Sequence, residues 1–219
     1  MFDGFFSYKA VKMITHIIWD YNGTIVNDVL ASVEAVNFML DNRGLEHTDI
    51  EAYKNNIDMP ILNYYKTVGI CDDVSKLSIE YRQGLMNNSH LISIFEGVRD
   101  VIEAANKKGI KSILLSSLYH EYLIEEVTDY GIKDLFYIIQ GMPDRYVGSK
   151  TQNAIDILNE EGILPENVLC VGDLKSDAEL ARSIGADCLL VDSGHMSRER
   201  LEKTGFKVVS SICDVVDFL

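Results

Sequence analysis

The sequence predicts an α/β fold, with a parallel β-sheet, helices on both faces and a small all-helical insertion after the first strand. Outside that insertion, short apolar runs alternate with helical patterns along the whole chain. Three of the apolar runs end in polar residues, at Asp20, Ser116 and Asp173. The carboxyl ends of parallel strands meet at one edge of a sheet, so we expect these three side chains to lie together.

The first strand is expected over residues 14–20, where an apolar run ends at a carboxylate. From Asp28 the pattern becomes helical, because apolar residues recur at spacings of three and four, at Val29, Val33, Val36 and Leu40. Further short helices fill the chain to about residue 88, and nothing in that stretch has the pattern of a strand. We therefore predict a helical cap over residues 28–89, inserted into a core domain of residues 13–27 and 90–219.

After residue 95, helices and strands follow one another in regular order. Strands are expected at residues 110–115, 136–139, 168–171, 188–191 and 206–209. Helices are expected between Gly97 and Gly109, at residues 120–130, 150–161, 177–184 and 197–203, and at the C-terminus. Each strand–helix–strand connection should be right-handed.

Composition and charge limit the partners that this chain can take. The net charge of −14 over 219 residues disfavours binding to nucleic acid or to an anionic membrane, because both need a basic surface. No apolar stretch approaches the roughly 18–20 residues that span a bilayer, and the N-terminus lacks the pattern of a signal peptide. The cysteines form no close pair, which favours a reduced, cytoplasmic protein; they are Cys71, Cys170, Cys188 and Cys213.

Residues 1–12 are rich in aromatic side chains and are treated as an N-terminal arm without an assigned function. Met13 would itself make a natural start of the chain. The arm offers a surface for a homodimer, but the sequence does not determine the oligomeric state.

Four segments carry groups suited to phosphoryl transfer, namely DYNGT (20–24), LLSS (114–117), Lys150 at the start of a helix, and GDLKSD (172–177). Their order and spacing resemble the haloacid dehalogenase superfamily of phosphotransferases, over about residues 13–219. The resemblance implies a Rossmann-like core, a cap that closes over the site, and a phosphatase that needs Mg²⁺. The aromatic–Asn–Gly–Thr variant after Trp19-Asp20 is similar to one found in the phosphoglycolate-phosphatase-like branch. The substrate would be a small phosphorylated metabolite.

The resemblance also implies roles for single residues. Asp20 matches the family nucleophile, which forms an aspartyl-phosphate that water hydrolyses. Asp173 and Asp177 would bind Mg²⁺ together with Asp20 and the backbone carbonyl of Asn22; the alternative for Asp177 is to cap its helix and to act on the metal site indirectly. Lys150 would reduce the repulsion between nucleophile and phosphate. Donors to the phosphoryl oxygens would come from Gly23, Thr24, Ser116 and Ser117.

Asn22 departs from the pattern of the family, which usually has Asp at this position to protonate the leaving group and activate water. An amide orients groups but does not transfer a proton. The favoured consequence is a slower phosphatase that prefers leaving groups needing little protonation. The alternatives are a mutase, which the sequence supports poorly, and a phosphate-binding or regulatory module with low turnover. A metal-independent dehalogenase is disfavoured because it has no use for Asp173 and Asp177.

The remaining candidates carry less weight. The five histidines lack metal-ligand spacing. His120, just after the second segment, is more often a surface or core residue than a substrate contact in such a position. Residues 55–60 lie where this family often sets specificity, and a plain turn explains them equally well.

Overall fold

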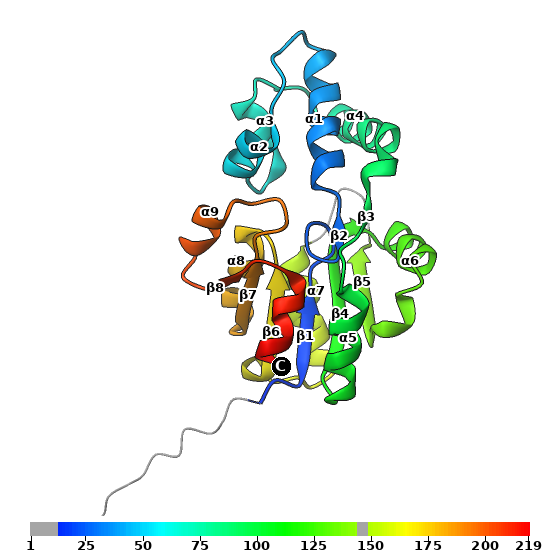
Figure 1. Ribbon diagram of the computed structural model, residues 1–219, viewed down its shortest axis with the longest axis vertical. Coiled ribbons are helices and arrows are strands. Elements are labelled where there is room, and N and C mark those ends of the chain that lie inside the picture. Colours follow the sequence, from blue (N-terminus) through cyan, green and yellow to red (C-terminus); the bar gives the residue numbers. More distant parts are fainter. Residues whose placement is uncertain (1–12, 144–148) are drawn as a thin grey trace, which may run out of the picture.

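The computed structural model describes residues 13–143 and 149–219 of the chain. An α/β core lies below a layer of helices that is connected to it through two neighbouring strands (Figure 1). The N-terminal arm expected at residues 1–12 lies outside the described residues.

The core sheet contains six parallel strands within the described chain, in the order β5-β4-β1-β6-β7-β8. Their bounds are β1 (His16–Trp19), β4 (Lys111–Tyr119), β5 (Ile138–Met142), β6 (Val168–Gly172), β7 (Asp187–Val191) and β8 (Lys207–Val209). Strand β1 lies between β4 and β6, so the order along the sheet reverses there. In a parallel sheet, the crevice at such a reversal is the usual place for a ligand.

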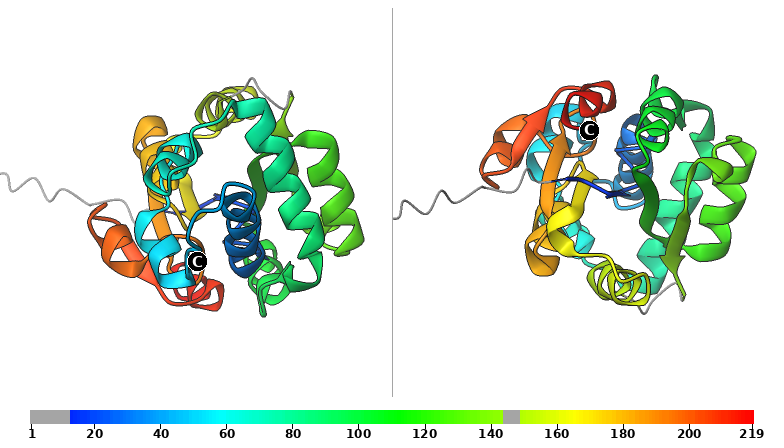
Figure 2. Two further views of the ribbon diagram at one scale, coloured as in Figure 1. Left: turned by 90° about the horizontal axis from the view of Figure 1, so that it is seen from above. Right: turned by 90° about the horizontal axis from the view of Figure 1, so that it is seen from below.

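Helices cover both faces of this sheet (Figure 2). One face packs against α5 (Val98–Lys107), α6 (His120–Asp129) and the C-terminal 3₁₀-helix η4 (Ile212–Phe218). The other face packs against α7 (Lys150–Glu160), α8 (Lys175–Ile184) and α9 (Arg198–Glu202). Strand β1 is buried on both sides, because Trp19 contributes to the first core and Ile18 to the second. The predicted α/β fold is confirmed.

Four helices between β1 and α5 form the upper layer in Figure 1, and we call them the helical cap. They are α1 (Val29–Asp41), α2 (Ile50–Asn56), α3 (Ile61–Thr67) and α4 (Val74–Asn87). The chain enters through β2 (Val26–Asn27) and leaves through β3 (Ser93–Ile94), which pair antiparallel. The helical content of the insertion is as expected, whereas domain boundaries at residues 28 and 89 stay a prediction.

Several elements differ from the expectation in detail. Strand β4 continues through Ser116 and Ser117 to Tyr119, because a shift in register after Leu115 lets the strand pair again with β5 at Met142. The two serines alone look like the end of a strand, so the sequence did not reveal this extension. Helix α8 begins at Lys175 instead of residue 177, and the last helix is a 3₁₀-helix. Short 3₁₀-helices also occur at Ser89–Leu91, Lys133–Leu135 and Pro165–Asn167.

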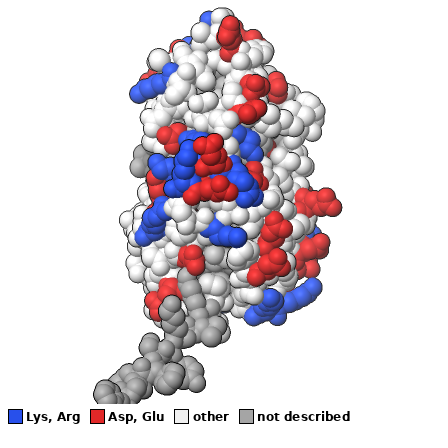
Figure 3. Space-filling model, turned by 60° about the vertical axis from the view of Figure 1, so that its left-hand side comes forward, with Lys and Arg blue, Asp and Glu red and all other residues white. Residues whose placement is uncertain are grey.

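Two further features of the structure concern membrane-spanning helices and surface charge. Among the described residues, no helix combines the length and the apolar character needed to cross a membrane. On the face that carries α9, acidic and basic side chains lie intermixed (Figure 3). Within α9, Arg198 pairs with Glu202, and Glu199 pairs with Lys203 just beyond the helix, so these cations form no separate basic patch.

Candidate active site

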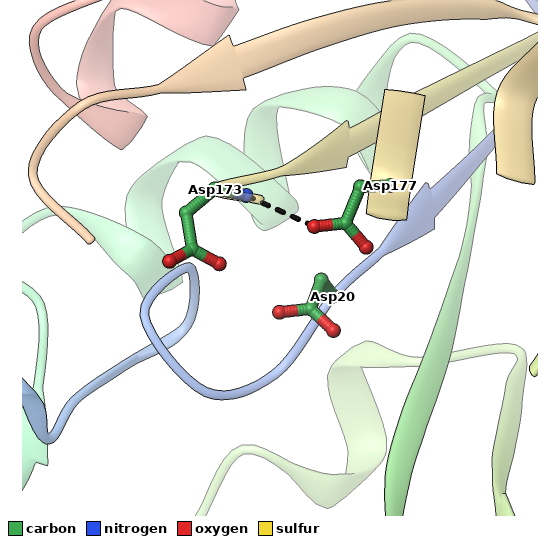
Figure 4. A group of neighbouring side chains, drawn as sticks. All are labelled: Asp20, Asp173 and Asp177. Atoms are coloured by element: carbon green, nitrogen blue, oxygen red, sulfur yellow. Dashed lines mark hydrogen bonds between the residues drawn. The ribbon is translucent and has the colours of Figure 1, made fainter. Parts of the chain in front are cut away.

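Three carboxylates meet at the carboxyl end of the central strands. Asp20 follows β1, Asp173 follows β6 and Asp177 lies in the first turn of α8 (Figure 4). One carboxylate oxygen of each residue lies within 4.8 Å of the others. Strand pairing fixes this arrangement, because the backbone N–H of Asp20 donates to the carbonyl of Val171 at 2.8 Å. The structure therefore brings Asp20 next to Asp173 and Asp177, which lie about 150 residues further along the sequence.

Lys150 supplies a cation to this cluster from the start of α7. Its Nζ donates to Oδ1 of Asp20 and, at 2.7 Å, to Oδ1 of Asp177. The hydroxyl of Ser149 caps the helix by accepting the N–H of Gln152 at 3.2 Å, which fixes the first turn from which Lys150 extends. Burial alone would lower the pKa of Lys150, but the carboxylates of Asp177 and Asp20 outweigh it and raise the pKa, so the ammonium stays charged.

Asp177 uses its two oxygens for different tasks. Oδ1 accepts from Lys150, and Oδ2 accepts the backbone N–H groups of Asp173 at 3.2 Å and Leu174 at 3.0 Å (Figure 4). The residue thus stabilises the N-terminus of α8 and also faces the carboxylate cluster. Helix capping and metal binding, the two roles that the sequence left open for Asp177, therefore do not exclude each other.

Burial and like charge make the cluster costly without a counter-ion. Burial, followed by the repulsion of Asp177, raises the pKa of Asp20 to about 6 against the lowering effect of Lys150. Burial also raises the pKa of Asp173 to about 8, with smaller contributions from Asp20 and Asp177, although His195 opposes the shift. Both shifts reflect carboxylates that resist ionisation mainly because burial removes them from water, and the negative charge of their neighbours adds to this effect.

The donor set fits a small divalent cation. Three buried or half-buried carboxylates converge from β1, β6 and α8, and one lysine does not balance their charge. Mg²⁺ prefers a few carboxylate oxygens and keeps places for water and phosphate. Asp20, Asp173 and Asp177 are the residues that would hold it.

The turn after Asp20 packs closely against Asp173. Thr24 is fully buried, and its hydroxyl donates to Oδ1 of Asp173 at 3.3 Å. Gly23 has a φ of +76°, and a Cβ built at this position overlaps with Oδ2 of Asp173 and with the ring of His195. Only glycine combines this backbone conformation with so close an approach. Gly23 and Thr24 therefore shape the turn and contact the carboxylate cluster; their expected role in phosphate binding stays a prediction.

The side chain of Asn22 is fixed by a hydrogen bond to Asp28. Its Nδ2 donates to Oδ2 of Asp28 at 3.0 Å, while Oδ1 of Asp28 accepts the backbone N–H of Gly23 at 3.1 Å. Asp28 precedes helix α1, yet its side chain makes no capping hydrogen bond there. It is directed instead toward the turn that carries Asn22.

The two serines at the second motif have unequal environments. Ser116 is buried, and its hydroxyl accepts the backbone N–H of Leu118 at 3.0 Å, whereas Ser117 is exposed. The register pairs Leu114 with Trp19, which puts Ser116 one residue beyond the level of Asp20 along the sheet. Within the described chain, no hydrogen bond joins either serine to the carboxylate cluster. Their contact with a phosphoryl group stays a prediction.

Sequence reasoning missed His195, the residue that connects several parts of this site. Its backbone N–H donates to Oδ2 of Asp173 at 2.6 Å, and its Nε2 lies 3.0 Å from Oδ1 of Asp28. Burial would lower the pKa of His195, but Asp28 and Asp173 raise it to about 9. The sequence offered no signal for this role, because His195 follows a Gly in a segment without metal-ligand spacing. By contrast, Nδ1 of His120 accepts the N–H of Gly141 at 3.2 Å and supports β5.

The chain is similar to known hydrolases in sequence and in fold. A model of haloacid dehalogenase-like hydrolases matches residues 17–191 of the chain. A solved haloacid dehalogenase-like family hydrolase from Streptococcus pneumoniae superimposes with a TM-score of 0.80 at 18% identity, covering 94% of this chain and 98% of that one.

Curated relatives include a phosphoglycolate phosphatase from Synechococcus elongatus, 24% identical over 84% of this chain and 87% of its own length. A tyrosine-protein kinase, PtkA, from Mycobacterium tuberculosis is 21% identical over 89% of this chain and 67% of its own length. The family model covers most of the chain, including the turn after Asp20 and the carboxylates of Asp173 and Asp177. The chain therefore belongs to the haloacid dehalogenase-like hydrolase family.

Proposed function

We propose that this protein is a Mg²⁺-dependent phosphatase that hydrolyses a small phosphorylated metabolite through an aspartyl-phosphate on Asp20. The observation that carries the proposal is the contact of Lys150 with both Asp20 and Asp177, next to Asp173. A nucleophilic carboxylate, a cation beside it and two further carboxylates for a metal ion are what hydrolysis of a phosphomonoester needs. Similarity to phosphoglycolate phosphatases supports the same class of substrate.

The first step transfers the phosphoryl group to the protein. An oxygen of Asp20 attacks phosphorus, the bond from phosphorus to the ester oxygen breaks, and the leaving oxygen takes a proton from solvent. Lys150 lies against Asp20, where its charge reduces the repulsion between carboxylate and phosphate. A metal ion would be held by Asp20, Asp173 and Asp177, together with the backbone carbonyl of Asn22. Its charge would offset the negative charge of the phosphoryl oxygens.

The second step releases phosphate. Water attacks phosphorus of the aspartyl-phosphate, the bond to the Asp20 oxygen breaks, and the water proton passes to solvent. Asn22 does not take up that proton, but its amide is oriented by Asp28 and offers Oδ1 as an acceptor for the attacking water. Without a side-chain acid at this position, turnover should favour acyl and aryl phosphates, whose leaving groups need little protonation.

The hypothesis of a low-turnover phosphate-binding module rests on the same Asn22. It predicts that phosphate binds in the presence of Mg²⁺ while no monoester is hydrolysed. We also propose the cytoplasm as the location, since all four cysteines are unpaired.

The test is phosphate release from acyl, aryl and alkyl phosphates, with and without Mg²⁺, by the wild type and by Asp20→Asn. Asp20→Asn keeps the shape of the side chain but removes the nucleophile. We expect wild-type turnover only with Mg²⁺, fastest on acyl and aryl phosphates, and no turnover by the variant. Equal activity of the two proteins would rule out an aspartyl-phosphate on Asp20. An inert wild type that still binds inorganic phosphate would support the binding module instead.

A further inference from the structure

His195 makes hydrogen bonds to three separate parts of the molecule. Its backbone N–H donates to Asp173 beside the nucleophile, and its Nε2 is joined to Asp28 at the base of α1. Its Nδ1 lies 3.0 Å from the hydroxyl of Tyr53, which belongs to α2 in the helical cap. His195 thus contacts the helical cap and the residue before α1 with its side chain, and the carboxylate cluster with its backbone.

The bonds continue from Asp28 to the turn that carries Asn22. Asp28 binds His195 with Oδ1 and Asn22 with Oδ2, and Oδ1 also accepts the N–H of Gly23. A continuous chain of hydrogen bonds therefore runs from Tyr53 through His195 and Asp28 to Asn22. Tyr53, Asp28 and His195 are each at most 5% exposed, so water does not compete for these bonds.

The cap end of this chain lies within a larger contact between α2 and the segment from β7 to α9, which passes below α2 in Figure 1. Lys54 donates from Nζ to the carbonyl of Asp192 at 2.7 Å, and its own carbonyl accepts the N–H of Ser197 at 3.1 Å. Arg200 donates to the carbonyl of Ile57. These neighbouring bonds hold the cap against the core but do not lead to Asp28.

We propose that Tyr53, His195 and Asp28 are positioning residues that couple contact between the helical cap and the core to the orientation of Asn22. This inference rests on the proposed function and deepens it. When α2 is in contact with the core, Tyr53 fixes the ring of His195, His195 fixes Asp28, and Asp28 fixes the amide of Asn22. When that contact is lost, Asn22 and the turn at Gly23 lose one side of their support.

The chain provides a matched pair of variants for the test. Tyr53→Phe removes the hydroxyl that binds His195 and keeps the buried ring. Lys54→Met removes a bond between the same helix and the core that lies outside the chain of hydrogen bonds to Asn22. Tyr64→Phe serves as a further control, because it removes another buried hydroxyl of the cap, one that is not bonded to His195.

The first readout is hydrogen exchange measured by mass spectrometry in the presence of Mg²⁺ and inorganic phosphate, which needs no turnover. For Tyr53→Phe we expect faster exchange both in residues 192–200 and in residues 21–28, by roughly threefold or more. Lys54→Met should speed exchange in residues 192–200 while residues 21–28 stay as in the wild type. Tyr64→Phe should change neither segment. If Tyr53→Phe and Lys54→Met affect residues 21–28 equally, the coupling does not run through Tyr53, His195 and Asp28. If neither variant affects residues 21–28, the coupling is absent.

The second readout is the steady-state rate on the best aryl or acyl phosphate. Tyr53→Phe should lower kcat with KM changed less than about twofold, because alignment at the reacting centre is lost while binding is kept. Lys54→Met should lower kcat less than Tyr53→Phe does, because Lys54 makes no hydrogen bond to the groups that lead to Asn22. A change in KM alone for Tyr53→Phe would contradict a role in positioning Asn22. A wild type without turnover would overturn the proposed function, while the exchange experiment would still decide the coupling.

Discussion

The side chain of Asn22 donates a hydrogen bond to Oδ2 of Asp28 at 3.0 Å. Asp28 is almost completely buried; burial alone would raise its pKa, but His195 and the amide of Asn22 lower it. The position where the family usually has an acid therefore lies against a carboxylate that stays ionised. A neutral amide fits this environment, because a second carboxylate there would repel the first.

The effect of Asn22→Asp should depend on Asp28. The single variant replaces a hydrogen bond with repulsion between two carboxylates, so we expect a loss of about 2–3 kcal/mol in the free energy of unfolding. In the double variant Asn22→Asp/Asp28→Asn, the amide at position 28 donates to the new carboxylate, and most of that loss should be recovered. Urea denaturation of the wild type, the two single variants and the double variant measures the coupling between the two side chains. Additive effects would mean that the two side chains act independently.

The same double variant tests the missing acid. In this variant the amide at position 28 donates to the carboxylate at position 22. The variant should therefore hydrolyse alkyl phosphates faster than the wild type, by up to roughly 10²–10⁴-fold. Aryl and acyl phosphates should gain much less, since their leaving groups need little protonation. Rates across a series of leaving groups give this comparison. A uniform gain across the series would contradict proton transfer as the cause.

Lys150→Met should leave Asp20 and Asp177 without the cation that they share. We expect kcat to fall by roughly 10²-fold or more, because the charge lies where nucleophile and phosphate meet. Lys175→Met is the matched control, since Lys175 is exposed on the next helix and, among the residues that the structure describes, pairs with Glu179 alone. Phosphate-release assays at saturating substrate compare the three proteins. Equal losses in both variants would show that general charge, and not the position of Lys150, matters.

Mg²⁺ should stabilise the folded protein through the carboxylate cluster. At a Mg²⁺ concentration 100 times the dissociation constant, binding to the folded state alone adds about 2.7 kcal/mol to the free energy of unfolding. Asp173→Asn should lose most of this gain, whereas Asp156→Asn should keep it, because Asp156 lies exposed on α7. Denaturation with Mg²⁺ and with EDTA measures the difference. An equal gain in Asp173→Asn would place the cation elsewhere.

Gly23→Ala should disturb the site beyond its effect on the backbone. Gly23 and Gly109 have similar φ values, +76° and +79°, but only the Cβ at Gly23 would meet other atoms, those of Asp173 and His195. Gly109→Ala should therefore cost about 1–2 kcal/mol from backbone strain, and Gly23→Ala about 1–3 kcal/mol more from overpacking. Urea midpoints of the two variants test the difference. Equal costs would mean that the turn moves away from Asp173 without penalty.

The sequence by itself determined the fold class and most of the carboxylate cluster. Apolar runs set the strands, and helical spacings set the helices between them, since burial in these elements follows a local period. Asp20 and Asp173 could be selected because each follows a strand, where parallel topology directs groups to one edge, whereas Lys150 was implied by the resemblance to the haloacid dehalogenase superfamily. The extension of β4 past Ser116 was missed, because it depends on pairing with β5.

Only the tertiary structure revealed the environment of Asn22. Asp28 looked like the residue that begins a helix, and His195 had no pattern around it, yet both meet at the turn after Asp20. The contact of His195 with Tyr53 joins positions that are 142 residues apart. Local sequence patterns report which residues are buried in an element, but hydrogen bonds between distant side chains depend on how the cap is placed on the core.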